Sequence, residues 1–285
     1  MSDTLVAVLI LGGVGLVFGV FIAIANKRLW VWEDPRIDIV AQMLPNANCG
    51  ACGLPGCRAF AEQAVEGKVT PAQCTVSGEA ARDQIAGFLG VDAGEAVKNV
   101  ARLLCGGGSD VAGYQAEYRG LPTCAAAAAV AGGGKGCAWG CLGLADCERV
   151  CDFDAIHMSE FGLPVVDIEK CTACGDCVDA CPKSLFELRP VNAGLLVPCR
   201  NLIDGDDVLE QCKVACTACG KCVQDAAAGL ISVATGVAVV NYDRIGFAEP
   251  RAVERCPTGA IVWLSGAQFA PTAAPALATS GSDWQ

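Results

Sequence analysis

The chain has 285 residues, of which 20 are cysteine and one is histidine, and its formal net charge at pH 7 is −11. This acidic balance argues against nucleic acid as a partner, because phosphate contacts need patches of Lys and Arg. The cysteine content leaves disulfides, zinc or iron–sulfur clusters as explanations. Secreted disulfide scaffolds are usually much shorter than this chain, and zinc sites usually combine pairs of Cys or His. Closely spaced C-x2-C-x2-C runs therefore favour iron–sulfur clusters.

The N-terminal region contains an uncharged apolar run from Leu5 to Ala25. As a helix it would be about 31 Å long, enough for the hydrocarbon core of a bilayer. A cleaved signal peptide is the alternative, because Ala23-Ile24-Ala25 resembles a cleavage site, but no Lys or Arg precedes the run. Lys27 and Arg28 follow it, so the positive-inside rule predicts a single-pass anchor with the downstream domains in the cytoplasm.

The predicted span also has glycines one turn apart at Gly15 and Gly19, with Gly12 a turn earlier. This spacing allows another membrane helix to approach closely, although it also arises by chance in glycine-rich spans. We therefore expect a membrane subunit as a partner on the Gly15/Gly19 face. The span holds no charge, so it has no group of its own with which to carry an ion.

The first cysteine group lies in NCGACGLPGC and in PAQC further on, with the spacing C-x2-C-x4-C followed by a fourth cysteine. The interspersed glycines free the backbone to wrap around a bulky cluster. A structural zinc knuckle is the alternative. The predicted ligands of this first [4Fe-4S] cluster are Cys49, Cys52, Cys57 and Cys74.

The next region, residues 91–134, is rich in Ala and Gly, and we expect a helical connector. The sequence GGGKG at 132–136 has neither the spacing nor the Ser/Thr of a phosphate-binding loop, so it is interpreted as a flexible linker.

Two cysteine motifs follow, one on each side of a predicted strand–turn–strand. Cys171–Pro182 has the full spacing C-x2-C-x2-C-x3-C-P, whereas Cys137–Cys151 has C-x3-C-x5-C-x3-C. In two-cluster ferredoxins the fourth cysteine of each motif ligates the other cluster. This crossover predicts a second cluster on Cys137, Cys141, Cys147 and Cys181, and a third on Cys151, Cys171, Cys174 and Cys177.

The last motif starts normally at Cys216, but Ala226 occupies the position of its fourth cysteine. A second predicted hairpin follows, with its turn at Thr235-Gly236, and CPTGAI then closes the repeat. The same crossover predicts a fourth cluster on Cys216, Cys219, Cys222 and Cys256. The cysteines absent from this repeat form the complete ligand set of its other cluster, so this unit is predicted to hold one cluster.

Four cysteines remain without a role: Cys105, Cys124, Cys199 and Cys212. Free cysteines are often buried as small hydrophobes, and a further metal site or a redox-active pair are the alternatives. His157 is interpreted as structural or exposed. No nucleophile or acid–base pair stands out, so we predict no catalytic residue and no complete active site in this chain alone.

Together these patterns predict an α+β chain. Its parts are a transmembrane anchor (1–28), a four-cysteine [4Fe-4S] domain (29–90), the helical connector (91–134), a two-cluster ferredoxin-like unit (135–195), a degenerate one-cluster ferredoxin-like unit (196–264) and a disordered tail (265–285). The two tandem units are expected to be of βαββαβ type, and the predicted cofactors are four [4Fe-4S] clusters.

This order of parts resembles the long form of the B subunit of the Rnf (Rsx) complex, the bacterial ion-translocating ferredoxin:NAD oxidoreductase. The resemblance rests on the N-terminal anchor, NCGACGLPGC, KGCAWGCLGLADCERVC, CTACGDCVDACP and CPTGAI. It implies a subunit on the cytoplasmic side of the bacterial inner membrane. That subunit would pass electrons between soluble ferredoxin or flavodoxin and membrane redox centres, coupled to Na⁺ or H⁺ transport.

Two other functions remain open at this point. The chain could be the iron–sulfur electron-transfer subunit of another membrane oxidoreductase, although such subunits usually have four complete C-x2-C-x2-C motifs and a late anchor. It could also be a scaffold for storing metal or assembling clusters, which predicts labile iron and no fast electron exchange with ferredoxin.

Overall fold

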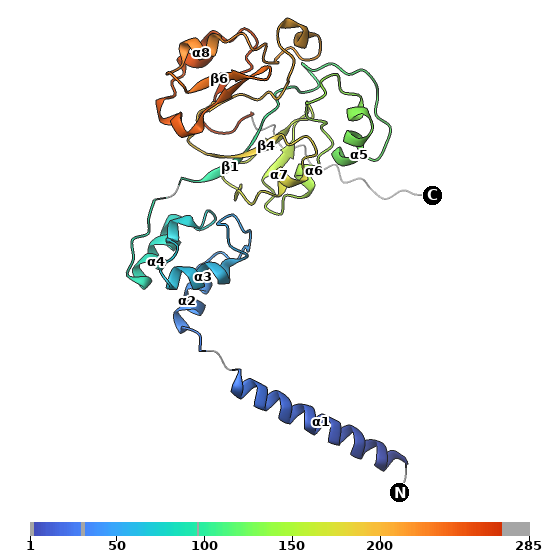
Figure 1. The fold of residues 1–285 in the computed structure, drawn as a ribbon, viewed down its shortest axis with the longest axis vertical. Coiled ribbons are helices and arrows are strands. Elements are labelled where there is room, and N and C mark those ends of the chain that lie inside the picture. The colour runs from blue at the N-terminus through green and yellow to red at the C-terminus, as the bar shows by residue number, and fades with distance from the viewer. Residues whose placement is uncertain (1–2, 30–31, 96, 270–285) are drawn as a thin grey trace.

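The computed structural model describes residues 3–29, 32–95 and 97–269. The first helix, α1 (Asp3–Arg28), stands apart from the rest of the chain (Figure 1). Its large apolar side chains face outwards, as Leu11 does with 73% of its surface exposed. Over Val8–Arg28 this helix is long and apolar enough to cross a membrane. Exposing so much apolar surface to water is unfavourable, so α1 associates the chain with a membrane.

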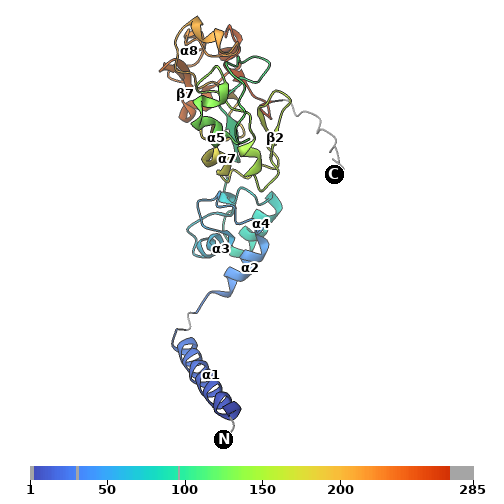
Figure 2. The same cartoon turned by 90° about the vertical axis from the view of Figure 1, so that its right-hand side faces the viewer.

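The four-cysteine region is a small helical body. It consists of α2 (Pro35–Met43), α3 (Cys57–Val65), the 3₁₀ turn η1 (Pro71–Gln73) and α4 (Glu79–Leu89). Asp34 caps α2 by accepting a hydrogen bond from the backbone N–H of Arg36, and Pro35 occupies the first helical position. The helices pack through Val40, Phe60 and Ile85, all at most 1% exposed. This body lies between α1 and the strands of the chain (Figure 2).

Residues 97–134 differ from the expected helical connector. The strand β1 (Asn99–Leu103) pairs antiparallel with β4 (Phe186–Pro190), placing Ala101 opposite Leu188. Four of the five β1 residues are buried, because both faces of the strand are covered. Only short helical pieces follow, α5 (Cys124–Ala129) and η2 (Ala131–Gly134). The GGGKG segment is packed rather than loose, since Lys135 is only 6% exposed.

Residues 135–195 contain a short hairpin between two short helices. The elements are α6 (Asp146–Arg149), β2 (Ile156–Met158), β3 (Pro164–Val166) and α7 (Asp176–Ala180), followed by β4. β2 pairs antiparallel with β3, with Ile156 opposite Val166. Both residues join a core that includes Leu103 of β1 and several cysteines. The hairpin therefore anchors the cysteine-bearing helices to β1 and β4.

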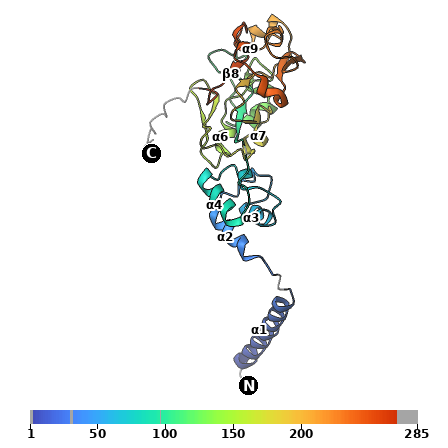
Figure 3. The same cartoon turned by 90° about the vertical axis from the view of Figure 1, so that its left-hand side faces the viewer.

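Residues 196–264 repeat this arrangement. β5 (Leu195–Leu196) and β8 (Val262–Trp263) pair antiparallel, and they enclose η3 (Asp206–Glu210), α8 (Lys221–Asp225), β6 (Ile231–Ala234), β7 (Val237–Val240), η4 (Tyr242–Phe247) and α9 (Arg251–Glu254). The predicted turn joins β6 to β7, where Thr235 and Gly236 have φ of 46° and 83°. Two successive positive φ angles suit the twist of a two-residue hairpin. Figure 3 shows α9 and β8 at the end of the molecule remote from α1.

The predicted disordered tail lies largely outside the described residues, which end at Phe269. Its described part is packed against β1. Arg102 donates from Nη1 to the carbonyl of Gly266 at 2.8 Å, and the backbone N–H of Leu103 donates to Oε1 of Gln268 at 2.8 Å.

Candidate metal centres

All 20 cysteines are free thiols. They line separate cavities of about 320 to 360 Å³, four to a cavity. Four of the cavities are named here by one cysteine each: the Cys49 site (Cys49, Cys52, Cys57, Cys74), the Cys171 site (Cys151, Cys171, Cys174, Cys177), the Cys147 site (Cys124, Cys141, Cys147, Cys181) and the Cys216 site (Cys216, Cys219, Cys222, Cys256). A fifth cavity is lined by Cys105, Cys137, Cys199 and Cys212.

The Cys49 site is built by a loop that leads into α3. The side chain of Asn48 accepts a hydrogen bond from the backbone N–H of Cys57 at 2.9 Å, which closes the loop onto the helix start. Gly56 must be glycine, because a Cβ there would lie 2.8 Å from Oδ1 of Asn48. From the other side Ser77 donates its hydroxyl to Sγ of Cys74 at 3.1 Å. The predicted ligand set is thus brought to one cavity.

A turn recurs after the last cysteine of each motif. The residue three positions on has a left-handed φ, at Asp154 (50°), Ser184 (50°) and Gly259 (67°). The next N–H then faces the sulfur. Ala155 donates to Cys151 Sγ and Leu185 to Cys181 Sγ, both at 3.4 Å, and the N–H of Ala260 hydrogen-bonds Cys256 in the same way.

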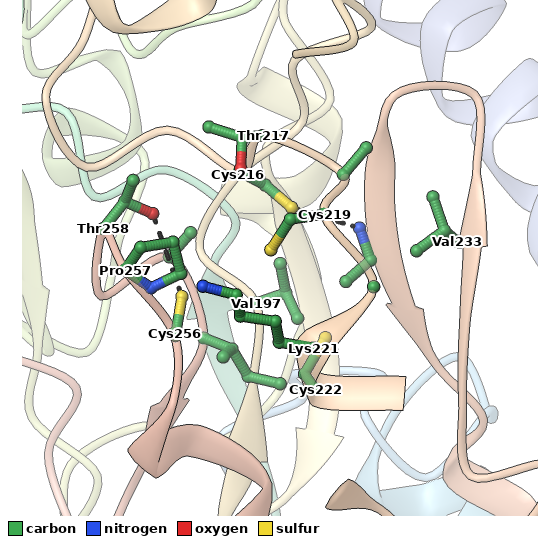
Figure 4. A pocket seen from close by; sticks show the side chains of 15 residues that line it. Val197, Cys216, Thr217, Cys219, Lys221, Cys222, Val233, Cys256, Pro257 and Thr258 are labelled. Atoms are coloured by element: carbon green, nitrogen blue, oxygen red, sulfur yellow. Dashed lines mark hydrogen bonds between the residues drawn. The ribbon is translucent and has the colours of Figure 1, made fainter. Parts of the chain in front are cut away.

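Cys256 therefore has the backbone geometry of the two other closing cysteines. Figure 4 shows its sulfur facing the same space as those of Cys216, Cys219 and Cys222. Three of these sulfurs come from α8 and the loop before it, and the fourth from the end of α9. The truncated motif thus meets a fourth cysteine from a distant part of the chain.

The Cys147 site differs from the predicted second ligand set. The structure brings Cys141, Cys147 and Cys181 together, but Cys124 lines this cavity with them, and Cys137 lines the fifth cavity instead. Cys124 begins α5. The backbone N–H of Ala125 donates to Oδ2 of Asp146 at 3.0 Å, which ties α5 to α6.

The backbone explains this exchange. After Cys171 and Cys216, positive φ angles recur two and four residues on, at Ala173/Gly175 and at Ala218/Gly220. The same pattern follows Cys141, at Gly143 and Ala145. The motif is therefore C-x2-Leu-x2-C, with Leu144 at the position held by Cys174 and Cys219 in the other repeats. The spacing Cys141-x5-Cys147 contains this signal, which the prediction from cysteine spacing alone missed.

Burial sets the protonation of most of these thiols. It raises the pKa of Cys141 and of Cys177 to about 12, and that of Cys222 to about 11. Such thiols are uncharged at neutral pH, so iron must displace their protons when it binds. Cys256 differs: burial alone would raise its pKa, but hydrogen bonds from the backbone N–H groups of Thr258, Ile261 and Ala260 outweigh burial and lower it.

The cavities suit clusters better than single ions. In the described part of the chain, no three Cys, His, Asp or Glu side chains converge closely enough to hold one metal ion. Zinc ligands must all lie about 2.0–2.3 Å from one point. Here four sulfurs instead surround a space of about 320 Å³ or more, as the thiolate ligands of a multi-iron cluster do.

The comparisons with known proteins agree with this chemistry. A family model described as a putative Fe-S cluster matches residues 44–76, which contain the Cys49 site. A model described as a 4Fe-4S binding domain matches residues 163–187, which contain most of the Cys171 site. The chain thus contains iron–sulfur domains of the 4Fe-4S type.

Three similar proteins, each the B subunit of a membrane complex, cover most of the chain. That of the Na⁺-translocating ferredoxin:NAD⁺ oxidoreductase complex of Acetobacterium woodii is 45% identical over 261 residues, which is 92% of this chain and 78% of that protein. That of the ion-translocating oxidoreductase complex of Methanosarcina acetivorans is 37% identical over 86% of this chain and 93% of its own length. That of the proton-translocating ferredoxin:NAD⁺ oxidoreductase complex of Clostridium ljungdahlii is 37% identical over 92% of this chain and 93% of its own length.

Proposed function

Because the chain belongs to the family of B subunits of the Rnf-type ion-translocating oxidoreductase complexes, we propose that it relays electrons between a soluble ferredoxin or flavodoxin and the membrane subunits. Members of this family are electron-transfer components of a larger complex. The proposed overall reaction is ferredoxin:NAD oxidoreduction coupled to Na⁺ or H⁺ transport. This chain would contribute the electron path, and other subunits the NADH site and the ion path.

The cysteine sites supply that path. A bound [4Fe-4S] cluster takes up and gives back electrons at a potential set by hydrogen bonds, charge and solvent exposure. We assign clusters to the Cys49, Cys171, Cys147 and Cys216 sites. In this assignment residues 135–195 and 196–264 are tandem ferredoxin-like units, the second of which holds one cluster.

The observation that best supports a relay is contact between successive sites. The hydroxyl of Thr75, the neighbour of Cys74, donates to the carbonyl of Thr172, the neighbour of Cys171, at 2.9 Å. This bond joins the Cys49 site to the Cys171 site. The Cys171 site then meets the Cys147 site through α7 and α6, which pack together and bear Cys177 and Cys147. These three sites therefore form a series.

The anchor places this series at a membrane. In the proposed topology α1 crosses the bilayer once, and Lys27 and Arg28 hold the cluster-bearing part on the cytoplasmic side of the bacterial inner membrane. The glycines of α1 are open to a neighbouring helix, since a Cβ at Gly15 or Gly19 would meet nothing within 4 Å. We assign that face to a membrane subunit of the complex.

The experiment is to tag the full chain, extract it from membranes under anaerobic conditions and assay NAD⁺ reduction by reduced ferredoxin. We expect membrane subunits to copurify and the preparation to be active. A matched Cys174→Ser variant should still copurify, because α1 is untouched, but should lose most of the activity. Copurification without ferredoxin-dependent activity in the wild type would overturn the function, and copurification with a different oxidoreductase would favour the alternative membrane enzyme.

A further inference from the structure

We propose that Cys105, Cys137, Cys199 and Cys212 bind an additional [4Fe-4S] cluster between the two ferredoxin-like units, and that Cys124 is the fourth ligand of the Cys147 site. This cavity is called the Cys105 site below. The inference goes beyond the relay function, because it concerns ligation and does not depend on which partners donate or accept the electrons.

The Cys105 site matches the other cavities in size and in donor set. Its volume is about 360 Å³, the same as that of the Cys216 site. Its four cysteines come from separate segments: the residues after β1, the loop before α6, the residues after β5 and the residues after η3. A redox-active pair would require two sulfurs, whereas here four line one space.

The backbone holds these segments together and leaves room for the sulfurs. The N–H of Gly106 donates to the carbonyl of Pro198 at 2.8 Å, which joins the segment of Cys105 to that of Cys199. Gly107 lies directly against the thiols, since a Cβ there would be 3.1 Å from Sγ of Cys212 and 3.7 Å from Sγ of Cys105. A side chain at Gly107 would therefore crowd the sulfurs.

Two of the sulfurs accept backbone hydrogen bonds. The N–H of Cys141 donates to Sγ of Cys105 at 3.3 Å, and the N–H of Cys216 donates to Sγ of Cys199 at 3.4 Å. Bonds of the same kind and length occur in the Cys171 and Cys147 sites, at Cys151 and Cys181. Such bonds stabilise the negative charge of ligating thiolates and influence the cluster potential.

A buried lysine supplies a matching positive charge. Lys135 lines the cavity, is only 6% exposed and donates from Nζ to the carbonyls of Gly107 at 2.6 Å and Cys141 at 2.7 Å. Among the ion pairs of the described residues, none involves Lys135. Buried ammonium groups are rare without a compensating charge. A cluster held by four thiolates is anionic and provides that charge.

The new site closes a gap in the relay. Cys141 is a ligand of the Cys147 site and hydrogen-bonds a ligand of the Cys105 site, whereas Cys216 does the same from the other side. The Cys105 site therefore lies between the Cys147 and Cys216 sites. The complete series is Cys49, Cys171, Cys147, Cys105 and Cys216, and it assigns every cysteine of the chain to one cluster.

The test is the iron and acid-labile sulfide content of the full chain, purified anaerobically in detergent. Five four-iron clusters predict about 20 of each per chain, and four predict about 16. Cys199→Ala should lose about four irons, and the double variant Cys199→Ala with Cys137→Ala should lose no more, because both residues serve one cluster. Cys124→Ala should lose about four irons from a different cluster. A content of about 16 that Cys199→Ala leaves unchanged would overturn the proposal.

Lys135→Met gives a readout that does not depend on removing a ligand. The side chain stays similar in size, so we expect the iron content to be unchanged. Loss of the buried positive charge should lower the midpoint potential of one cluster, followed by electron paramagnetic resonance during a redox titration. Unchanged potentials in all clusters would contradict a cluster beside Lys135.

Discussion

Replacing Cys256 with alanine tests whether the truncated motif is completed by a distant ligand. Cys256 is one of four cysteines around the Cys216 site, and the other three come from a single loop and helix. A [4Fe-4S] cluster that loses a thiolate ligand is expected to fall apart, so the variant should hold about four fewer irons and sulfides per chain. Because metal binding contributes folding energy, residues 196–264 should also unfold at a lower temperature.

The matched control is Ala226→Cys, which restores a cysteine at the position where this motif lacks one. By the crossover, that cysteine belongs to a second cluster whose other ligand positions hold no cysteine. We therefore expect the iron content of Ala226→Cys to equal that of the wild type. The assay is iron and acid-labile sulfide per chain after anaerobic purification. An unchanged iron content in Cys256→Ala, or an equal loss in both variants, would refute the assignment.

Three further predictions concern stability and cluster access. Leu185→Ala, at a residue only 1% exposed in the core around β1, should cost about 2–5 kcal/mol in the free energy of unfolding, whereas Leu202→Ala, at a residue 51% exposed, should change it by less than about 0.5 kcal/mol; anaerobic denaturant titration compares the two. Gly236→Ala should cost about 1–3 kcal/mol by the same assay, because φ is 83° there and the new Cβ would lie 2.5 Å from the carbonyl carbon of Leu202, and an unaffected variant would contradict the described turn. A mild iron chelator should remove the cluster of the Cys216 site first, because Cys219 is the one exposed cysteine of the chain; earlier loss of the signals from the buried Cys171 site would contradict this order.

Local spacing was enough to predict much of the site. The hairpin turn at Thr235-Gly236 was predicted from alternating apolar residues around a single glycine, and the structure confirms it. The family was identified from four short motifs, and the comparisons confirm it. Cys256 was assigned from the residues that follow it, and the structure brings it to Cys216. These inferences succeed because each rests on a few consecutive residues whose backbone geometry repeats.

The remaining features depend on contacts between distant segments. β1 pairs with β4 across more than eighty residues, and no local pattern in the Ala/Gly-rich stretch indicates that partner. Cys124 and Cys137 are close in sequence, yet they line different cavities, because α5 packs on α6 whereas the loop after Lys135 turns towards β1. Which cysteine completes which set is therefore decided by tertiary packing.

The most direct test of the relay is the number of electrons that the cluster-loaded full chain accepts from reduced ferredoxin in a rapid-mixing experiment. We predict fast bleaching of the visible absorbance of the oxidised clusters, with uptake of about one electron per cluster and retention of iron in the presence of a mild chelator. Slow or absent uptake, accompanied by transfer of iron to the chelator, would contradict electron transfer and identify the chain as a cluster scaffold.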